Sequence, residues 1–401
     1  MKILNVSSFC SDKTFNDLFI KLKKKPQTSI QKFYNLFING LILNGNEVYS
    51  LTNRQIYTDE KKLFFKSYKE SISNVCTFLY LPVITISLIN QLCLSLCTII
   101  FMILYFIKNK REVIVFCDMM RFWISIPTLL IAKLFRIKVY VIVADIPQMY
   151  NMHKKGNISF LRRISKLIYS KFSHYYDGYI LFSKFMNDKV NIKKKPYIVI
   201  EGMVDFNDKI EKNKIQNKIE KNIFMYSGGL YEKFGVKCLV DSFIYLKNEN
   251  IELWLCGQGE LEEYILSLKV KNIKYLGYLS NKKVIRLQKK ADFLVNPRFS
   301  DEEYTKYSFP SKILEYMLSG TPVISTKLKG IPDEYFDFLI TIDKENIEGF
   351  IEIINRVCEF SIEKRRKIGS KSRSFVLNEK NNKYQSKKII DWIFSINQIG
   401  R

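Results

Sequence analysis

Three residues in the C-terminal half, Ser311, Lys312 and Glu315, have the types and spacing of a site for an anion and its neighbouring hydroxyls. If a helix begins at this point, its first backbone N–H groups and the Lys312 ammonium could hold a diphosphate, because the N-terminus of a helix attracts anions. Glu315 lies one turn further on and suits two adjacent hydroxyls, such as those of a ribose. The alternative interpretation is an ordinary strand–helix unit whose helix is well capped.

A strand, a loop and a helix must position these three residues. The apolar run from Ala291 to Val295 predicts a buried strand. Ser308 is the candidate N-cap of the helix, Pro310 suits its first turn, and Gly320 ends it. The apolar residues after Pro322 then begin the next buried strand.

Glycines follow two other predicted strands of the same half. Gly228 and Gly229 come after a strand over 222–226, and Gly257 and Gly259 come after a strand over 252–255. Glycine lets the backbone approach a phosphate closely. Each pair alone is a weak signal, but three such features at strand ends are more specific together.

Composition limits the classes of protein and of partner. A chain of 401 residues with 47% hydrophobic residues predicts about two domains with packed cores. The net charge of +25 favours an anionic partner, which could be a nucleotide, an acidic membrane surface or a nucleic acid. The eight cysteines form no CxxC pair and are typical of buried thiols in a reducing compartment. Only two histidines occur, which excludes a histidine-rich metal site.

The order of elements predicts two successive α/β series, each with a parallel sheet. We assign 1–205 to an N-terminal domain, completed by a returning helix over 384–401, and 206–383 to a C-terminal domain. The charged segment 208–221 is a candidate linker. The basic segment 13–29 is predicted to be a mobile flap.

The longest apolar stretch, Phe78 to Ile107, is long enough to span a bilayer. Spanning would separate the first strands from the rest of their sheet. A buried core helix and a helix lying in the membrane interface remain the alternatives. The basic helix predicted over 160–172 would be either a solvated face or a second contact with anionic lipid. We therefore expect a cytoplasmic protein in peripheral contact with the anionic inner face of the cell membrane.

Three segments together resemble a known family. They are GGLYEKFGVK (228–237), LWLCGQGELEEY (253–264) and EEYTKYSFPSKILEYMLSGTPVIST (302–326). They resemble the family 4, retaining glycosyltransferases, and most of all the branch that builds bacterial capsular and other surface polysaccharides. The resemblance covers the C-terminal domain and reaches the N-terminal one through ADIP (144–147) and QKFYNLFINGLILNG (31–45). It implies the GT-B fold, in which two Rossmann-like domains face a cleft.

The resemblance also implies roles for the residues that bind the donor. Glu315 matches the second glutamate of the family's paired-glutamate motif and would bind the ribose of a nucleotide sugar, most often a UDP-sugar. Ser311 and Lys312 would face the diphosphate, and Lys233 would neutralise it. Gly257 would let the chain pass near the base. The nucleotide sugar would be a co-substrate, with no separate cofactor and no metal ion.

The chain departs from the family at two positions. Tyr307 stands where the first glutamate of the motif would fall, so Glu303 in the acidic run just before it is the candidate that meets the sugar. The usual Gly-Arg is replaced by Gly228 and Gly229, so Arg298 is the candidate replacement for the phosphate-binding arginine.

The acceptor side offers Asp145, which follows the strand predicted over 138–143. Asp145 either orients the acceptor or caps a turn. His153 and His174 are candidate bases, although packed or surface histidines are the commoner case.

The resemblance implies transfer of a hexosyl group to a hydroxyl of a lipid-linked or polysaccharide acceptor in cell-surface glycan synthesis. A nucleotide-sugar epimerase and a non-catalytic binding subunit of the same fold remain the alternatives. A nucleic-acid binder is not favoured, because the basic residues are scattered and no recognition module is present.

Overall fold

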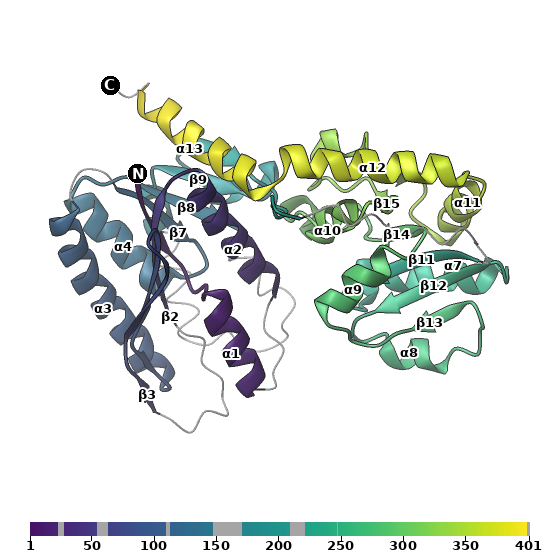
Figure 1. Ribbon diagram of the computed structural model, residues 1–401, viewed down its shortest axis with the longest axis horizontal. Coiled ribbons are helices and arrows are strands. Elements are labelled where there is room, and N and C mark those ends of the chain that lie inside the picture. The colour runs from purple at the N-terminus through teal and green to yellow at the C-terminus, as the bar shows by residue number, and fades with distance from the viewer. Residues whose placement is uncertain are drawn as a thin grey trace. The chain divides into compact units, whose positions relative to one another are not determined.

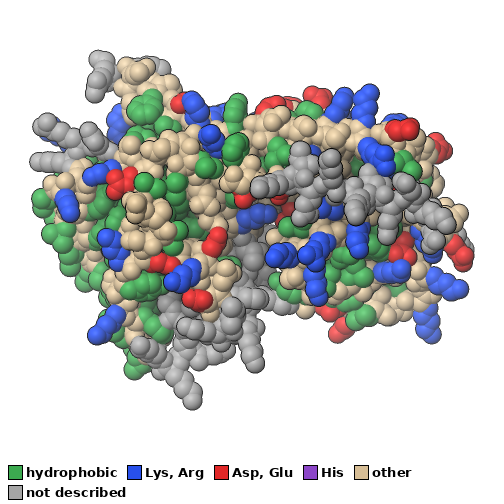
Figure 2. Space-filling model, in the orientation of Figure 1, with side chains coloured by type: hydrophobic (Ala, Val, Ile, Leu, Met, Phe, Trp, Pro, Cys, Tyr) green, Lys and Arg blue, Asp and Glu red, His purple; other side chains and the backbone are tan. Residues whose placement is uncertain are grey.

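The computed structural model describes residues 1–22, 28–53, 63–109, 113–146, 171–208, 221–246 and 248–398. The chain divides into two compact units (Figure 1). The N-terminal unit comprises Met1–Met203 and Asn382–Arg401, and the C-terminal unit comprises Val204–Asn381. Lysine and arginine side chains are scattered over the visible face of both units (Figure 2).

The N-terminal unit is built on an eight-stranded sheet in the order β10-β9-β8-β7-β1-β2-β5-β4. Every neighbouring pair is parallel except β4 and β5. The strands are β1 (Lys2–Val6), β2 (Glu47–Asn53), β4 (Tyr68–Ser73), β5 (Cys76–Leu81), β7 (Val113–Asp118), β8 (Val139–Val143), β9 (Gly178–Leu181) and β10 (Tyr197–Val199). A short antiparallel pair, β3 (Phe64–Phe65) and β6 (Val83–Ile84), lies outside this sheet.

Helices cover both faces of this sheet (Figure 1). On one side lie α1 (Asp12–Leu22) and α2 (Thr28–Leu43), and on the other α3 (Ser87–Lys108) and α4 (Phe122–Leu134). The last helix, α13 (Asn382–Gln398), packs against α2. Their approach requires Gly40, because a Cβ there would lie 2.1 Å from the Asn382 carbonyl oxygen. The short elements are η1 (Ser173–Tyr175), η2 (Lys184–Met186) and α6 (Asn187–Val190).

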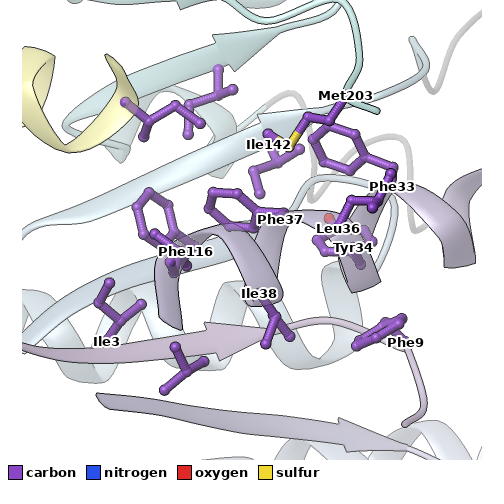
Figure 3. Packing of buried hydrophobic residues seen from close by; sticks show 14 of the residues in the cluster. Ile3, Phe9, Phe33, Tyr34, Leu36, Phe37, Ile38, Phe116, Ile142 and Met203 are labelled. Carbon is purple, nitrogen blue, oxygen red and sulfur yellow. The ribbon is translucent and has the colours of Figure 1, made fainter. Parts of the chain in front are cut away.

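Aromatic side chains fill the core between α2 and the sheet. Figure 3 shows Phe37 of α2 pointing toward Phe116 of β7, and their ring centroids are 5.2 Å apart. Ile389 and Ile393 of α13 belong to the same buried cluster. The chain therefore uses its last helix to complete the core of its first unit.

Two predictions for this unit are wrong. The predicted flap over 13–29 contains α1 and the first residues of α2, although 23–27 lie outside the described residues. The N-terminus of α1 is capped by Ser11, whose hydroxyl accepts the Thr14 N–H at 3.1 Å. The apolar stretch 78–107 is not one helix, because its first residues form β5 and pair with β2 before Pro82.

The C-terminal unit has a six-stranded, wholly parallel sheet in the order β13-β12-β11-β14-β15-β16. Its strands are β11 (Asn222–Ser227), β12 (Ile251–Cys256), β13 (Ile273–Tyr275), β14 (Phe293–Asn296), β15 (Val323–Thr326) and β16 (Ile340–Ile342). Its longer helices are α7 (Val236–Leu246), α8 (Glu262–Ser267), α9 (Asn281–Gln288), α10 (Lys312–Ser319), α11 (Ile347–Cys358) and α12 (Ile362–Glu379). Short turns of helix are η3 (Glu232–Phe234), η4 (Glu303–Tyr307) and η5 (Asp333–Tyr335).

The prediction of two doubly wound α/β domains is confirmed by these two sheets. The basic helix predicted over 160–172 and the linker predicted over 208–221 lie almost wholly outside the described residues.

Candidate functional site

The candidate donor site lies where the central strands of the C-terminal sheet end. Strands β12, β11 and β14 are parallel neighbours, so their carboxyl ends share one edge of the sheet. Gly228 and Gly229 follow β11, Gly257 follows β12, and Arg298 follows β14. The Gly228 N–H donates to the Cys256 carbonyl oxygen at 2.9 Å, which ties the first two turns together.

Gly257 is needed for contact between these turns. Its φ is +144°, and a Cβ there would lie 1.7 Å from the Gly228 carbonyl oxygen. The sequence prediction assigned this glycine to the passage of the chain near a base. The structure provides a separate and sufficient reason for the glycine, which is the close approach of Gly228.

Helix α10 begins later than predicted, and Ser308 is not its cap. The N-cap is Ser311, whose side chain makes no capping hydrogen bond. The Ser308 hydroxyl instead donates to the Tyr304 carbonyl oxygen at 3.1 Å, because η4 brings that oxygen within reach. The Ser311 side chain caps none of the first N–H groups of α10, and of these the Ile313 N–H donates to the Pro310 carbonyl oxygen at 2.8 Å. Gly320 ends the helix as predicted, with φ +80°.

Lys312 and Glu315 lie together at the start of this helix. The Lys312 Nζ is 3.3 Å from Glu315 Oε1, and the side chains are 37% and 12% exposed. Lys312 also lies near the end of β12. Burial raises the pKa of the Cys256 thiol to about 11, and the Lys312 ammonium opposes that rise. Ammonium and carboxylate are therefore both held at the edge where the glycine turns meet.

Gln288, at the end of α9, holds the Glu315 carboxylate in place. Its Nε2 donates to Glu315 Oε1 at 2.8 Å and to the Ser227 hydroxyl at 3.2 Å. Gln288 is fully buried. Sequence reasoning missed this residue, because no local pattern distinguishes a buried glutamine in a short helix.

Tyr316 joins helix α10 to the turn after β11. The Ser227 N–H donates to the Tyr316 hydroxyl at 2.9 Å, and the two hydroxyls are 3.2 Å apart. Both residues are buried. Glu315 and the glycine turn therefore belong to one hydrogen-bonded unit that includes Gln288.

The two other predicted cations, Lys233 and Arg298, both lie close to the aromatic ring of Phe234. The Lys233 Nζ lies 5.3 Å and the Arg298 Cζ 4.8 Å from the Phe234 ring centroid. The Tyr304 hydroxyl donates to the Lys233 carbonyl oxygen at 3.0 Å. Burial raises the pKa of Tyr304, and the Arg298 guanidinium opposes that rise, which again places the guanidinium nearby. These contacts pre-position two positive charges after β11 and β14.

Glu303 and Ser311 are exposed, and Tyr307 is half-buried. Glu303 is the first residue of η4 and Tyr307 the last. The structure thus keeps both candidates for the missing acid on the same short turn, which packs next to Lys233 through Tyr304.

Asp145 lies in the N-terminal unit, after β8. Loss of hydration, and next the Asp118 carboxylate, raise the pKa of Asp145 to about 6, although the residue keeps an exposed surface. Asp118 ends the neighbouring strand β7 and is buried. Sequence reasoning missed Asp118, which carried the same strand-end signal as Asp145. His174 is the last but one residue of η1, and His153 lies outside the described residues.

No cluster of three or more His, Cys, Asp or Glu side chains with the spacing of a metal site occurs within the described ranges. The predicted independence from metal ions remains a prediction.

Comparisons with known proteins bear on the family and the fold. Residues 207–375 match the family model described as Glycosyl transferases group 1. The chain is 26% identical over 211 residues to an uncharacterized glycosyltransferase, MJ1178, of Methanocaldococcus jannaschii. That match covers 50% of this chain and 54% of the relative, so it spans about half of the relative's length.

Two solved structures are similar over nearly the whole chain. A sucrose-phosphate synthase from Thermosynechococcus elongatus has a TM-score of 0.64 at 13% identity, with full coverage of both chains. Anabaena Alr3699/HepE, in complex with UDP and glucose, has a TM-score of 0.59 at 13% identity and covers 98% of this chain and 100% of its own. At this identity, the likeness shows the fold.

The fold is therefore GT-B, with two parallel Rossmann-like sheets. Residues 207–375, which match the model of the glycosyl transferases group 1 family, make up most of the C-terminal unit.

Proposed function

We propose that the protein is a retaining glycosyltransferase that moves a sugar from a nucleotide diphosphate sugar, UDP-linked by preference, to a hydroxyl of a lipid-linked or polysaccharide acceptor. One observation carries the proposal. Glu315 and Lys312 are held at the uncapped start of α10, and Tyr316 and Gln288 connect that helix to the turn at Gly228. This constellation lies inside the segment that matches the glycosyltransferase family.

The arrangement suits both halves of a nucleotide diphosphate. One Glu315 oxygen accepts from Gln288 and Lys312, and these contacts orient the carboxylate that would bind the ribose hydroxyls. The start of α10 and the Lys312 ammonium suit a diphosphate. The UDP and glucose bound by Anabaena Alr3699/HepE support a uridine nucleotide as the first donor to test.

The chemistry would proceed on one face of the sugar. The bond from the anomeric carbon to the diphosphate oxygen breaks, and a bond from the acceptor oxygen to that carbon forms on the same side. The acceptor proton passes to the leaving phosphate. Lys233, Arg298 and Lys312 would stabilise the negative charge that grows on this phosphate, because fixed positive groups lower the cost of charge development.

The same proposal assigns residues to the acceptor and the donor sugar, and it names a pathway. Asp145 would orient the acceptor hydroxyl, and Glu303 would meet the donor sugar in place of the acid that Tyr307 has replaced. Synthesis of a capsular or other surface polysaccharide is the pathway we propose, on the resemblance of the segment 302–326 to that branch.

The test is release of UDP from UDP-glucose, UDP-galactose and UDP-N-acetylglucosamine, with and without a lipid-linked glycan acceptor. We expect release from at least one donor that depends on the acceptor and is lost in Lys312→Ala. If UDP binds but no donor is turned over with any acceptor, the protein is a non-catalytic binding subunit. Tyr307 in place of the family's acid is the observation that favours this second function. Conversion of one UDP-sugar into another, with no acceptor present, would indicate an epimerase instead.

A further inference from the structure

Helix α3 presents an exposed apolar face, which we call the outer α3 face. It consists of Leu88, Ile89, Leu92, Leu96, Ile100, Leu104 and Ile107, each between 49% and 64% exposed. Between residues 88 and 107, all the exposed side chains are leucines or isoleucines. Most are four residues apart, so they lie along one side of the helix. Figure 2 shows hydrophobic side chains gathered along the edge of the N-terminal unit where α3 lies.

The opposite face of α3 is packed against the protein. Leu94, Thr98, Met102 and Phe106 are buried. The Ser95 hydroxyl donates to the Trp123 carbonyl oxygen of α4 at 2.8 Å. The helix is thus apolar on both sides, and the fold covers only one of them, which is unlike an ordinary amphipathic surface helix.

This helix is long and apolar enough to cross a membrane. The mean hydropathy of its most apolar 18-residue stretch is 2.0, and 17% of that stretch is buried. Its connections exclude crossing. Strand β5 precedes it and β7 follows it, and both belong to the sheet that contains β1 and β2. A bilayer cannot pass between strands of one sheet, because their backbone groups bond to one another. The outer α3 face can therefore meet a membrane only by lying along its surface.

Positive charge borders one end of this face. Phe106 of α3 and Phe135, just after α4, have ring centroids 5.7 Å apart, so the two helices end side by side. Exposed Lys108 and Arg136 lie at this end, and Leu134, the last residue of α4, is 77% exposed. An aliphatic face bordered by cations is the pattern of a protein seated in the interface of an anionic bilayer. The chain's net charge of +25 favours the same partner.

We propose that the outer α3 face seats the protein on an anionic lipid bilayer, with the aliphatic side chains among the acyl chains and the cations at the phosphates. The helix has 22 residues, so about 33 Å of it would lie parallel to the membrane plane. Given the lipid-linked acceptor of the proposed function, this seating would concentrate the enzyme at the surface that carries its acceptor.

The test is flotation with vesicles of phosphatidylcholine, with and without phosphatidylglycerol. A variant with Leu92→Glu, Leu96→Glu and Ile100→Glu places three carboxylates on the outer α3 face, where side chains are already exposed, so the fold should persist. We expect the unsubstituted protein to float with the phosphatidylglycerol vesicles. The variant should bind them about 1,000-fold more weakly, because it removes three apolar side chains from the bilayer and each buried leucine or isoleucine contributes about tenfold in affinity.

A matched control carries Tyr245→Glu and Leu266→Glu in the C-terminal unit, where the side chains are 65% and 64% exposed. It should float like the unsubstituted protein, and both variants should keep its UDP affinity in solution. Equal flotation of the α3 variant and the unsubstituted protein would overturn the proposal. The proposal would also be overturned if the protein bound neither kind of vesicle and sedimented as a dimer that the α3 substitutions dissociate. That result would assign the face to a second copy of the chain.

Discussion

Replacing Gln288 with leucine should weaken nucleotide binding, although Gln288 itself is buried behind the residue that would touch the nucleotide. The substitution removes two donated hydrogen bonds, to Glu315 Oε1 at 2.8 Å and to the Ser227 hydroxyl at 3.2 Å. The side chains are similar in volume, so the change is mainly one of polarity. Glu315 would keep its contact with Lys312, at 3.3 Å, and lose the buried amide that fixes its carboxylate.

The magnitude follows from these contacts. A hydrogen bond to a charged group contributes about 1.5–3 kcal/mol. Because Lys312 still holds the same carboxylate oxygen, we expect the lower end of that range in binding, about 1.5 kcal/mol, or about tenfold in Kd. The folded protein should lose about 1–3 kcal/mol of stability, because buried polar groups are left without a partner.

Titration calorimetry with UDP and with 2′,3′-dideoxy-UDP separates positioning from general damage. The tenfold loss should appear with UDP and nearly vanish with the dideoxy nucleotide, which lacks the hydroxyls that Glu315 would bind. Thr321→Val is the matched control. It removes a 2.8 Å bond to the Gln288 carbonyl oxygen without touching Glu315, so it should lower stability but leave the affinity for UDP unchanged. An equal loss for both nucleotides, or no loss for either, would refute the positioning role of Gln288.

Two further predictions concern the glycine turn and the acceptor side. Gly257→Ala should cost about 3 kcal/mol or more in urea unfolding, because its Cβ would meet the Gly228 carbonyl oxygen at 1.7 Å. Gly277→Ala is its control, since φ is also positive there, +69°, but nothing lies within 4 Å, so we expect only about 1–2 kcal/mol. Comparable losses for the two variants would contradict the close approach. For Asp145, kcat/KM should rise with pH through about 6, the raised pKa of its carboxyl, and Asp145→Asn should abolish that step. The folded pKa lies above the ordinary 3.8, so ionisation of Asp145 should reduce stability as pH rises from about 4 to about 6. A pH profile that Asp145→Asn leaves unchanged would remove this residue from the reaction.

Much of the C-terminal unit could be predicted from local signals. Apolar runs, glycines at strand ends and a glycine that stops a helix are short-range features. The strands β11, β12 and β14 and the end of α10 at Gly320 all follow from them. Ser308 was misassigned because an N-cap depends on where the preceding loop goes. The η4 turn brings the Tyr304 carbonyl oxygen to the Ser308 hydroxyl, and the N-cap of the helix falls later in the chain, at Ser311.

The errors in the N-terminal unit have a different cause. From Phe78 to Ile107 the sequence is apolar without a clear period, so it does not show where β5 ends and α3 begins.

The contact between Gln288 and Glu315 could not be predicted either, since it joins two helices through tertiary packing. Local patterns therefore predict the residues that would face the ligand, and they do not reveal Gln288, which holds Glu315.

The most direct test of the nucleotide site is a thermodynamic cycle, in which calorimetry measures how the unsubstituted protein and Glu315→Ala each bind UDP and a UDP without its ribose hydroxyls. With UDP, the substitution should weaken binding by about 3 kcal/mol, or more than 100-fold, because two hydrogen bonds to a carboxylate are lost. With 2′,3′-dideoxy-UDP, the unsubstituted protein and Glu315→Ala should bind within about threefold of each other, since the partners of the carboxylate are already missing. An affinity for UDP that Glu315→Ala leaves unchanged would contradict the assignment of this site to a nucleotide.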